Sequence, residues 1–269
     1  MSRGTVVVEQ DNLARTWAKA FYEITRPGTT EIVPLIVCVT GFEANVVRED
    51  QKIRNQLDAE LEAHGKQSVR TVASTIFPTS LWNPNSSPQE LFDRYARVLP
   101  RLKRDKRNHN GIYFERMMNF LPKNEEVEVN QIEYILGTRT TGNHRRSAYQ
   151  LSIIDPTRDH TNQRQRGFPC LQQVSISPIG EDRLSVPGFY ATQTLFERAY
   201  GNYIGLCELG RFFAHQWGMQ LTRVTCVASV AELDSSKPHM SKTEARALAQ
   251  QAMNLIEQIP EATTATNEG

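Results

Sequence analysis

The sequence predicts an α/β (α+β) fold built around a large sheet. Segments with strand-like and helix-like patterns alternate along the whole chain, and no internal repeat is present. No break in composition divides the 269 residues, and 39% of them are apolar, which is enough for one well-buried core. We therefore expect a single domain over residues 1–260, followed by a disordered tail over residues 261–269.

The first part of the chain contains clear signals for where helices begin and end. Asn12 precedes apolar residues at helical spacing, and Pro27-Gly28 ends that pattern. Ile53 and Leu57 begin a series that steps by four residues, as in an amphipathic helix. The elements predicted here are a helix between Asn12 and Pro27, a strand over 31–42, a helix over 47–64, a strand over 68–77 and a helix over 89–105.

The second part contains most of the predicted strands. A capping box, Ser241 with Glu244, predicts the start of the last helix. The elements predicted here are a short helix over 130–136, a strand over 147–154, a polar loop over 156–167, strands near 170–177 and 184–195, a helix over 201–217, a strand over 222–230 and a helix over 242–258.

Composition excludes several classes of function. The net charge is +1, so we expect neither nucleic acid nor membrane as a partner, and no stretch of about 18 apolar residues occurs. The four cysteines never form Cys-x-x-Cys, which argues against a metal site and against a disulfide framework. The P-loop, dinucleotide, zinc-protease and serine-hydrolase motifs are also absent. These observations predict a reduced, cytoplasmic protein without a metal.

Cys170 is the strongest candidate for chemistry. It follows the basic segment Arg164-Gln-Arg166 and opens an alternating strand pattern. Positive charge favours the thiolate, which is the reactive form of cysteine. The competing interpretation is an inert core residue, because cysteine is among the most buried residue types.

Five short segments occur in an informative order along the chain. They are Asn110-Gly111-Ile112-Tyr113, Asn130-Gln131-Ile132, Asn143-His144-Arg145-Arg146, Pro169-Cys170 and Gly201-Asn202-Tyr203. Together, over roughly residues 110–217, they resemble the thymidylate synthase family, which includes the pyrimidine hydroxymethylases. The resemblance implies a large mixed β-sheet flanked by helices, with one sheet face used to form a homodimer.

The resemblance also implies roles for individual residues. Cys170 matches the nucleophile that adds to C6 of a pyrimidine, and Tyr113 matches the tyrosine beside it. Arg145 and Arg146 match a pair that reaches the neighbouring subunit's nucleotide phosphate, although a solvated charge pair is the alternative. Asn202 matches the amide that reads the pyrimidine edge, with a plain loop or cap residue as the alternative.

Three further residues complete the predicted site. Glu90 is the candidate for the family's proton-transfer glutamate, although a helix-N-terminal glutamate is the competing interpretation. We expect Gln172, on the strand that opens at Cys170, to contact the substrate. Arg166, before Cys170, is a candidate for a substrate phosphate contact, with a disordered basic loop as the alternative.

Departures from the family pattern predict an altered substrate. Leu171 stands where the family has histidine after the nucleophile, and Ala191 stands where it has an arginine that grips phosphate. The family's His-x-Tyr, which holds the deoxyribose hydroxyl, falls on Asp234 and Ser236. Loss of a charge-assisted hydrogen bond costs about 1.5–3 kcal/mol, so ordinary dUMP methylation is not the expected reaction.

Three functions remain after this comparison. The first is an enzyme that uses Cys170 to activate a pyrimidine nucleotide or derivative for methylation or hydroxymethylation at C5, with 5,10-methylenetetrahydrofolate as the donor that the resemblance implies. The second is a catalytically inactive nucleotide-binding or regulatory protein on the same scaffold. The third is a structural protein without a ligand.

Overall fold

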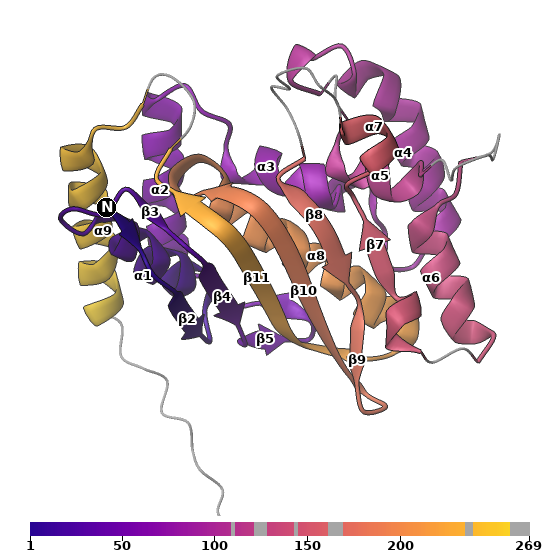
Figure 1. Cartoon of the computed structure of the whole chain (residues 1–269). Coiled ribbons are helices and arrows are strands. Elements are labelled where there is room, and N and C mark those ends of the chain that lie inside the picture. Colours follow the sequence, from indigo (N-terminus) through magenta and orange to yellow (C-terminus); the bar gives the residue numbers. More distant parts are fainter. Residues whose placement is uncertain (109–110, 121–127, 143–144, 161–168, 235–238, 259–269) are drawn as a thin grey trace, which may run out of the picture.

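The computed structural model of the chain describes residues 1–108, 111–120, 128–142, 145–160, 169–234 and 239–258. Within these ranges the fold is a mixed α/β arrangement in which one large mixed sheet is flanked by helices (Figure 1). The predicted tail over 261–269 lies outside the described residues.

The sheet is built around a long parallel pair of strands. β10 (Arg183–Thr194) and β11 (Gln220–Glu232) run side by side, with Phe189 opposite Val227. Antiparallel partners lie on both sides, β8 next to β10 and β4 next to β11. The other strands of this sheet are β1 (Ser2–Arg3), β2 (Val6–Gln10), β3 (Glu31–Ile32), β4 (Leu35–Val39), β7 (Gln150–Ser152), β8 (Leu171–Ser175) and β9 (Ser177–Ile179), and a separate hairpin joins β5 (Phe42–Glu43) to β6 (Val46–Val47).

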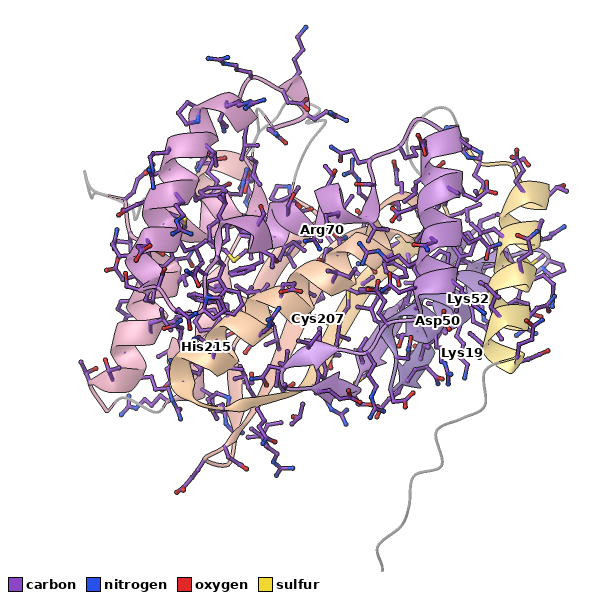
Figure 2. All side chains as sticks on the ribbon, turned by 180° about the vertical axis from the view of Figure 1, so that it is seen from behind. Lys19, Asp50, Lys52, Arg70, Cys207 and His215 are labelled. Atoms are coloured by element: carbon purple, nitrogen blue, oxygen red, sulfur yellow. The ribbon has the colours of Figure 1, made fainter. Side chains whose placement is uncertain are left out.

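Helix α8 (Tyr200–Trp217) connects the two central strands and covers one face of the sheet. Figure 2, which views the molecule from behind, shows α8 with Cys207 and His215 crossing this face. The other helices are α1 (Leu13–Thr25), α2 (Gln51–Ala63), α3 (Val69–Ile76), α4 (Pro88–Leu102), α5 (Tyr113–Met118), α6 (Gln131–Thr140), α7 (Pro156–Asp159) and α9 (Lys242–Glu257).

Helix α8 is buried on nearly every side because small residues let its neighbours approach. A Cβ atom at Gly205 would lie 2.7 Å from Ile76 Cβ and 2.9 Å from the Ala73 carbonyl oxygen, both on α3. A Cβ atom at Gly210 would lie 2.9 Å from Leu221 on β11. The helix is therefore clamped between α3 and the sheet, which fixes where its N-terminal turn projects.

The strand predicted over residues 68–77 is wrong, because this segment forms helix α3. Ser68 caps the helix by accepting a hydrogen bond from the Thr71 amide at 3.2 Å. Val69, Val72 and Ile76 share one helical face and are buried. The β-branched content of the segment favours a strand locally, but packing against α8 decides the outcome.

Other elements differ from prediction at their boundaries. The strand predicted over 31–42 is divided at Pro34 into β3 and β4, because proline lacks the amide that a sheet interior needs. Helix α2 begins at Gln51 and not at residue 47. Asp50 caps its N-terminus. The loop predicted over 156–167 contains α7, and the strand predicted over 147–154 is reduced to β7. The capping box of Ser241 and Glu244 is confirmed.

None of the helices within the described residues is long and apolar enough to span a membrane.

We predict that Gly205→Ala destabilises the protein by about 1–3 kcal/mol, because the new methyl group meets a backbone carbonyl that cannot move freely. The matched control is Gly137→Ala in α6, where a Cβ atom meets nothing within 4 Å. There we expect a gain of up to about 1 kcal/mol from helix propensity. Urea unfolding measures both, and equal effects of the two substitutions would contradict the packing described for α8.

Candidate active site

Cys170 lies at the mouth of strand β8, where the strand departs from regular pairing. Phe189 pairs with Gln173, but Tyr190 pairs with Leu171, so Gln172 is an extra residue in a bulge. The carbonyl oxygen of Gln172 accepts hydrogen bonds from the amides of Ile153 and Ile154. The bulge ends the regular ladder just after Cys170 and sets the direction in which its side chain leaves the sheet.

The Cys170 thiol is the accessible one of the four. It is half-buried, whereas Cys38, Cys207 and Cys226 are buried. Burial raises the pKa of each of these three thiols, for Cys226 to about 12, so they stay protonated near neutral pH. Cys170 Sγ lies 3.4 Å from Thr192 Oγ1, which gives the sulfur a hydroxyl neighbour.

Tyr113 lies against the start of β8. Burial first, and then the neighbouring charge of Cys170, raise the pKa of the Tyr113 hydroxyl, and the net value is about 12. Hydrogen bonding from the backbone amides of Leu171 and Cys170, together with the charge of Arg198, acts in the opposite direction. The structure thus brings Tyr113 and Cys170 together, and it holds the phenol protonated near neutral pH.

A second tyrosine, Tyr190, lies beneath the same site. Its side chain is fully buried, and its hydroxyl has no hydrogen-bond partner among the described residues. Burial raises its pKa well above the usual value, and the neighbouring Cys226, Tyr113, Tyr203 and Cys170 add to that rise. An unsatisfied buried hydroxyl is costly, so this group is available to a ligand.

A small polar network supports these tyrosines from the core side. Tyr203 donates a hydrogen bond to Gln193 Oε1 at 3.1 Å, and Gln193 Nε2 donates to Cys226 Sγ at 3.3 Å. All three side chains are almost completely buried. The network joins α8 to both central strands directly below the site.

Two more polar residues lie at the start of α8 and in the turn before it. Asn202, in the first turn of α8, is only 4% exposed. Arg198 lies one turn earlier, in the π-helical turn Leu195–Ala199, and donates a hydrogen bond to Gln67 Oε1 at 2.6 Å. These residues place an amide and a guanidinium on neighbouring turns.

A buried ion pair anchors the helix that carries Tyr113. Arg116 on α5 contacts both carboxylate oxygens of Asp159, at 2.7 and 2.9 Å, and donates to the Ile153 carbonyl at 3.1 Å. The Asp155 amide also donates to Asp159. Burial alone raises the pKa of Asp159, but these hydrogen bonds and the charges of Arg116 and Arg158 outweigh it, so the net shift is downward. The pair fixes α5 against the ends of β7 and α7.

Another buried cluster occupies the position where the resemblance placed a sugar contact. Lys66 Nζ lies 3.4 Å from Asp234 Oδ1 and 3.6 Å from Glu197 Oε2. Asp234 also accepts a hydrogen bond from the Met240 amide at 3.2 Å. The Asp234 carboxylate is therefore engaged in interactions within the protein. Ser236 lies outside the described residues.

Three predicted site residues lie away from Cys170. Arg145 and Arg146 are exposed and precede β7, and the antiparallel register of β7 and β8 places them toward the opposite end of β8 from Cys170. Glu90 is exposed on α4, where it pairs with Arg94 at 3.0 Å. Within one subunit, no described interaction links any of the three to the thiol.

The two remaining predicted site residues are Gln172 and Arg166. The side-chain amide of Gln172 turns back and donates to the Pro169 carbonyl oxygen, so it braces the segment before Cys170. Arg166 lies outside the described residues. Leu171, at the family's histidine position, is completely buried.

Sequence reasoning missed Tyr190, Thr192 and Arg198 as members of the site. The first two follow from strand register, since residues opposite Cys170 and Leu171 on β10 must lie beside the thiol. Arg198 carries a weaker signal, its position four residues before Asn202 at a helix start. Among the described residues, no three His, Cys, Asp or Glu side chains form a group that could hold a metal ion.

Comparison with protein-family models gives no matching family, and comparison with curated proteins gives no match. The resemblance to the thymidylate synthases accordingly stays a prediction from the order of the residues in the sequence.

We predict that Asp159→Asn lowers the free energy of unfolding by about 3 kcal/mol at neutral pH, because it removes one partner of a buried ion pair. A lowered carboxyl pKa stabilises the fold above the unfolded-state pKa of about 3.9, and this contribution is lost as the pH falls below that value. The difference between wild type and variant should therefore shrink in acid.

The control for this prediction is Asp182→Asn, at an exposed surface pair with Arg183, which should change stability little. Chemical denaturation from pH 3 to pH 8 compares the three proteins. A difference between wild type and Asp159→Asn that does not depend on pH would contradict the assignment.

Proposed function

We propose that the protein is an enzyme that uses Cys170 to activate a pyrimidine nucleotide or derivative for one-carbon transfer at C5. The observation that carries the proposal is the meeting of Tyr113 and Cys170, which are distant in sequence and which the resemblance assigns to one site. The half-buried thiol, the unsatisfied Tyr190 hydroxyl and the buried Asn202 amide support the same site.

The chemistry follows from the position of the thiol. The thiolate of Cys170 forms a bond to C6 of the ring, and the electron pair of the C5–C6 double bond makes C5 nucleophilic. C5 forms a bond to the one-carbon unit and loses its proton, and departure of the Cys170 thiolate restores the C5–C6 double bond. The resemblance implies 5,10-methylenetetrahydrofolate, which would supply this unit and would leave through cleavage of the bond between its nitrogen and the transferred carbon. A hydride from the same tetrahydrofolate, which would become dihydrofolate, would give a methyl product, and addition of water would give a hydroxymethyl product.

The neighbouring residues of the thiol have separate tasks in this scheme. Thr192 donates a hydrogen bond to the sulfur and stabilises its anionic form. Tyr113, with its pKa of about 12, stays neutral and orients a proton or water next to the ring instead of acting as a base. Asn202 reads the ring edge, since an amide both donates and accepts.

One observation favours a second function, a nucleotide-binding protein without catalysis. Leu171 is completely buried, so the position after the nucleophile offers no polar group to the ring oxygen or to water. Ala191 supplies no charge, and its amide is used for a hydrogen bond to the Cys170 carbonyl. The tritium-release assay described below distinguishes binding of a nucleotide from reaction with it.

The proposal includes a homodimer formed through the sheet face that lies opposite α8. On this face Phe189 is 44% exposed and Val7 is 63% exposed. Figure 1 shows no helix in front of the face, which is unusual for a wide sheet with exposed apolar groups. Arg145 and Arg146 lie far from the thiol of their own subunit, so a role in substrate binding requires that they reach a neighbour's site.

We predict that the protein releases tritium from a 5-tritiated pyrimidine nucleotide. Addition of Cys170 to C6 makes the C5 hydrogen exchangeable with solvent, even without the one-carbon donor. Cys170→Ser should reduce the release by about 1,000-fold or more, because it removes the nucleophile. The assay uses UMP, dUMP and CMP, each with and without 5,10-methylenetetrahydrofolate.

Cys38→Ser is the matched control, since Cys38 is a buried thiol on β4 that contacts Thr225 and takes no part in the scheme. It should leave the release unchanged. If no pyrimidine exchanges its C5 hydrogen while nucleotides raise the melting temperature, the binding protein is the correct alternative.

We predict that wild-type protein sediments as a dimer at micromolar concentration, and that Phe189→Asp raises the dimer dissociation constant by at least ~100-fold by placing a charge in the apolar interface. Val46→Asp is the control, because Val46 is equally exposed at 44% but lies on the separate β5–β6 hairpin. A monomeric wild type in sedimentation experiments would rule out the role proposed for Arg145 and Arg146.

A further inference from the structure

Arg198 carries a positive charge that the described protein groups leave without an acidic partner. Its guanidinium is half-buried and donates to Gln67, a neutral amide, at 2.6 Å. Among the described residues it forms no ion pair. The adjacent Glu197 faces Lys66 at 3.6 Å, so the nearest acid in sequence is already bound to another cation. A half-buried cation held by a neutral residue is typical of a site that receives an anion.

Arg198 and the thiol belong to the same end of the sheet. Thr192, near the end of β10, lies 3.4 Å from Cys170 Sγ, and the turn that carries Arg198 follows β10 directly. In agreement with this placement, the charge of Arg198 lowers the pKa of the Tyr113 hydroxyl, against the rise that burial and the Cys170 charge produce. The hydrogen bond to Gln67 fixes one Nη atom and leaves the other donors of the guanidinium for a ligand.

Two buried polar residues lie on the elements that meet at this end of the sheet. Asn202, which is 4% exposed, follows Arg198 by four residues, so the two side chains lie on the same side of the turn. The Tyr190 hydroxyl on β10, whose pKa responds to Tyr113 and Cys170, is buried without a partner among the described residues. Buried hydroxyls are normally satisfied, so Tyr190 points to a polar ligand.

We propose that Arg198 binds an anionic group of the ligand that Cys170 attacks, while Asn202 and the Tyr190 hydroxyl bind its neutral polar groups. This inference rests on the proposed function, in which Cys170 is the attacking group, and it narrows the substrate to a pyrimidine with a negative charge. The charge is that of a phosphate or of a carboxylate carried on the sugar, away from C5 and C6, since a guanidinium recognises both anions in the same way.

The first experiment needs no knowledge of the substrate. Cys170 is alkylated either by iodoacetate, which is anionic, or by iodoacetamide, which is neutral, and in both reactions the thiolate sulfur displaces iodide. Peptide mapping by mass spectrometry measures the rate at Cys170 alone. Because both reagents use the same thiolate, the ratio of the two rates reports on recruitment of the anion and is independent of thiol reactivity.

Arg198→Gln should lower the ratio of iodoacetate to iodoacetamide rates by about 10-fold, since it removes a charge-assisted contact. Arg198→Lys should retain most of the ratio. The matched control is Arg211→Gln, which removes a charge from the second half of α8, where Arg211 pairs with Glu208 at 3.5 Å. It should leave the ratio unchanged.

Two outcomes would overturn the inference. A ratio in Arg198→Gln equal to that of wild type means that Arg198 does not attract anions to the thiol. An equal loss in Arg198→Gln and Arg198→Lys means that the side chain acts through shape and not through charge. Melting temperatures of all variants verify that the fold is intact.

Calorimetric titration with uridine, UMP and uridine 5′-carboxylate identifies the anionic group. Wild type should bind one of the two anions at least ~10-fold more tightly than uridine, and Arg198→Gln should lose that preference. The outcomes are distinguishable from failure of the proposed function. If the alkylation ratio depends on Arg198 while no pyrimidine binds and none exchanges its C5 hydrogen, then the anion site stands and the pyrimidine reaction does not.

Discussion

Helix α8 is buried on nearly every side because the sheet and α3 both approach its backbone closely. This close packing fixes the position of its first turn, and with it Asn202. The preceding π-helical turn must then join the end of β10 to a helix whose position is already set, and that turn carries Arg198. The polar network of Tyr203, Gln193 and Cys226 ties the same region to both central strands. The candidate site is thus a consequence of how one apolar helix packs, although its functional groups are polar.

The other wall of the site depends on a polar interaction instead of an apolar one. Arg116 and Asp159 hold α5 against the ends of β7 and α7, and Tyr113 is the first residue of α5. Gln131 adds a second link, since its side chain bonds to backbone groups of both Arg116 and Ser152. The positions of Tyr113 and Cys170 are therefore determined by separate parts of the structure, one through the ion pair and one through the bulge in β8. Such rigid support is what a reacting thiol needs for precise orientation.

The strongly patterned elements were predictable from the sequence, and so were several residues of the candidate site, whose function stays a prediction. Helix α8, the central strands and the capping box of Ser241 follow from periodicity and from local hydrogen bonding. Segment 68–77 was not predictable in the same way, because its β-branched residues favour a strand until α8 is present to bury one helical face. Cys170, Tyr113 and Asn202 were predicted from their order in the chain. Tyr190 and Thr192 require the strand register, and Arg198 requires the knowledge that Glu197 is bound to Lys66, which only the three-dimensional structure provides.

The polar groups around Cys170 favour a ligand site over an inert thiol. The surroundings of an inert thiol would be expected to fill with apolar side chains or to pair their polar groups internally, because unsatisfied buried polar atoms cost free energy. Leu171 and Ala191 fit that description, but Tyr190 and Arg198 do not. One buried hydroxyl without a partner, that of Tyr190, and one cation without an acidic partner among the described residues remain near an accessible thiol. A ligand that satisfies them would explain their cost to stability, and the same groups would then determine which ligand it is.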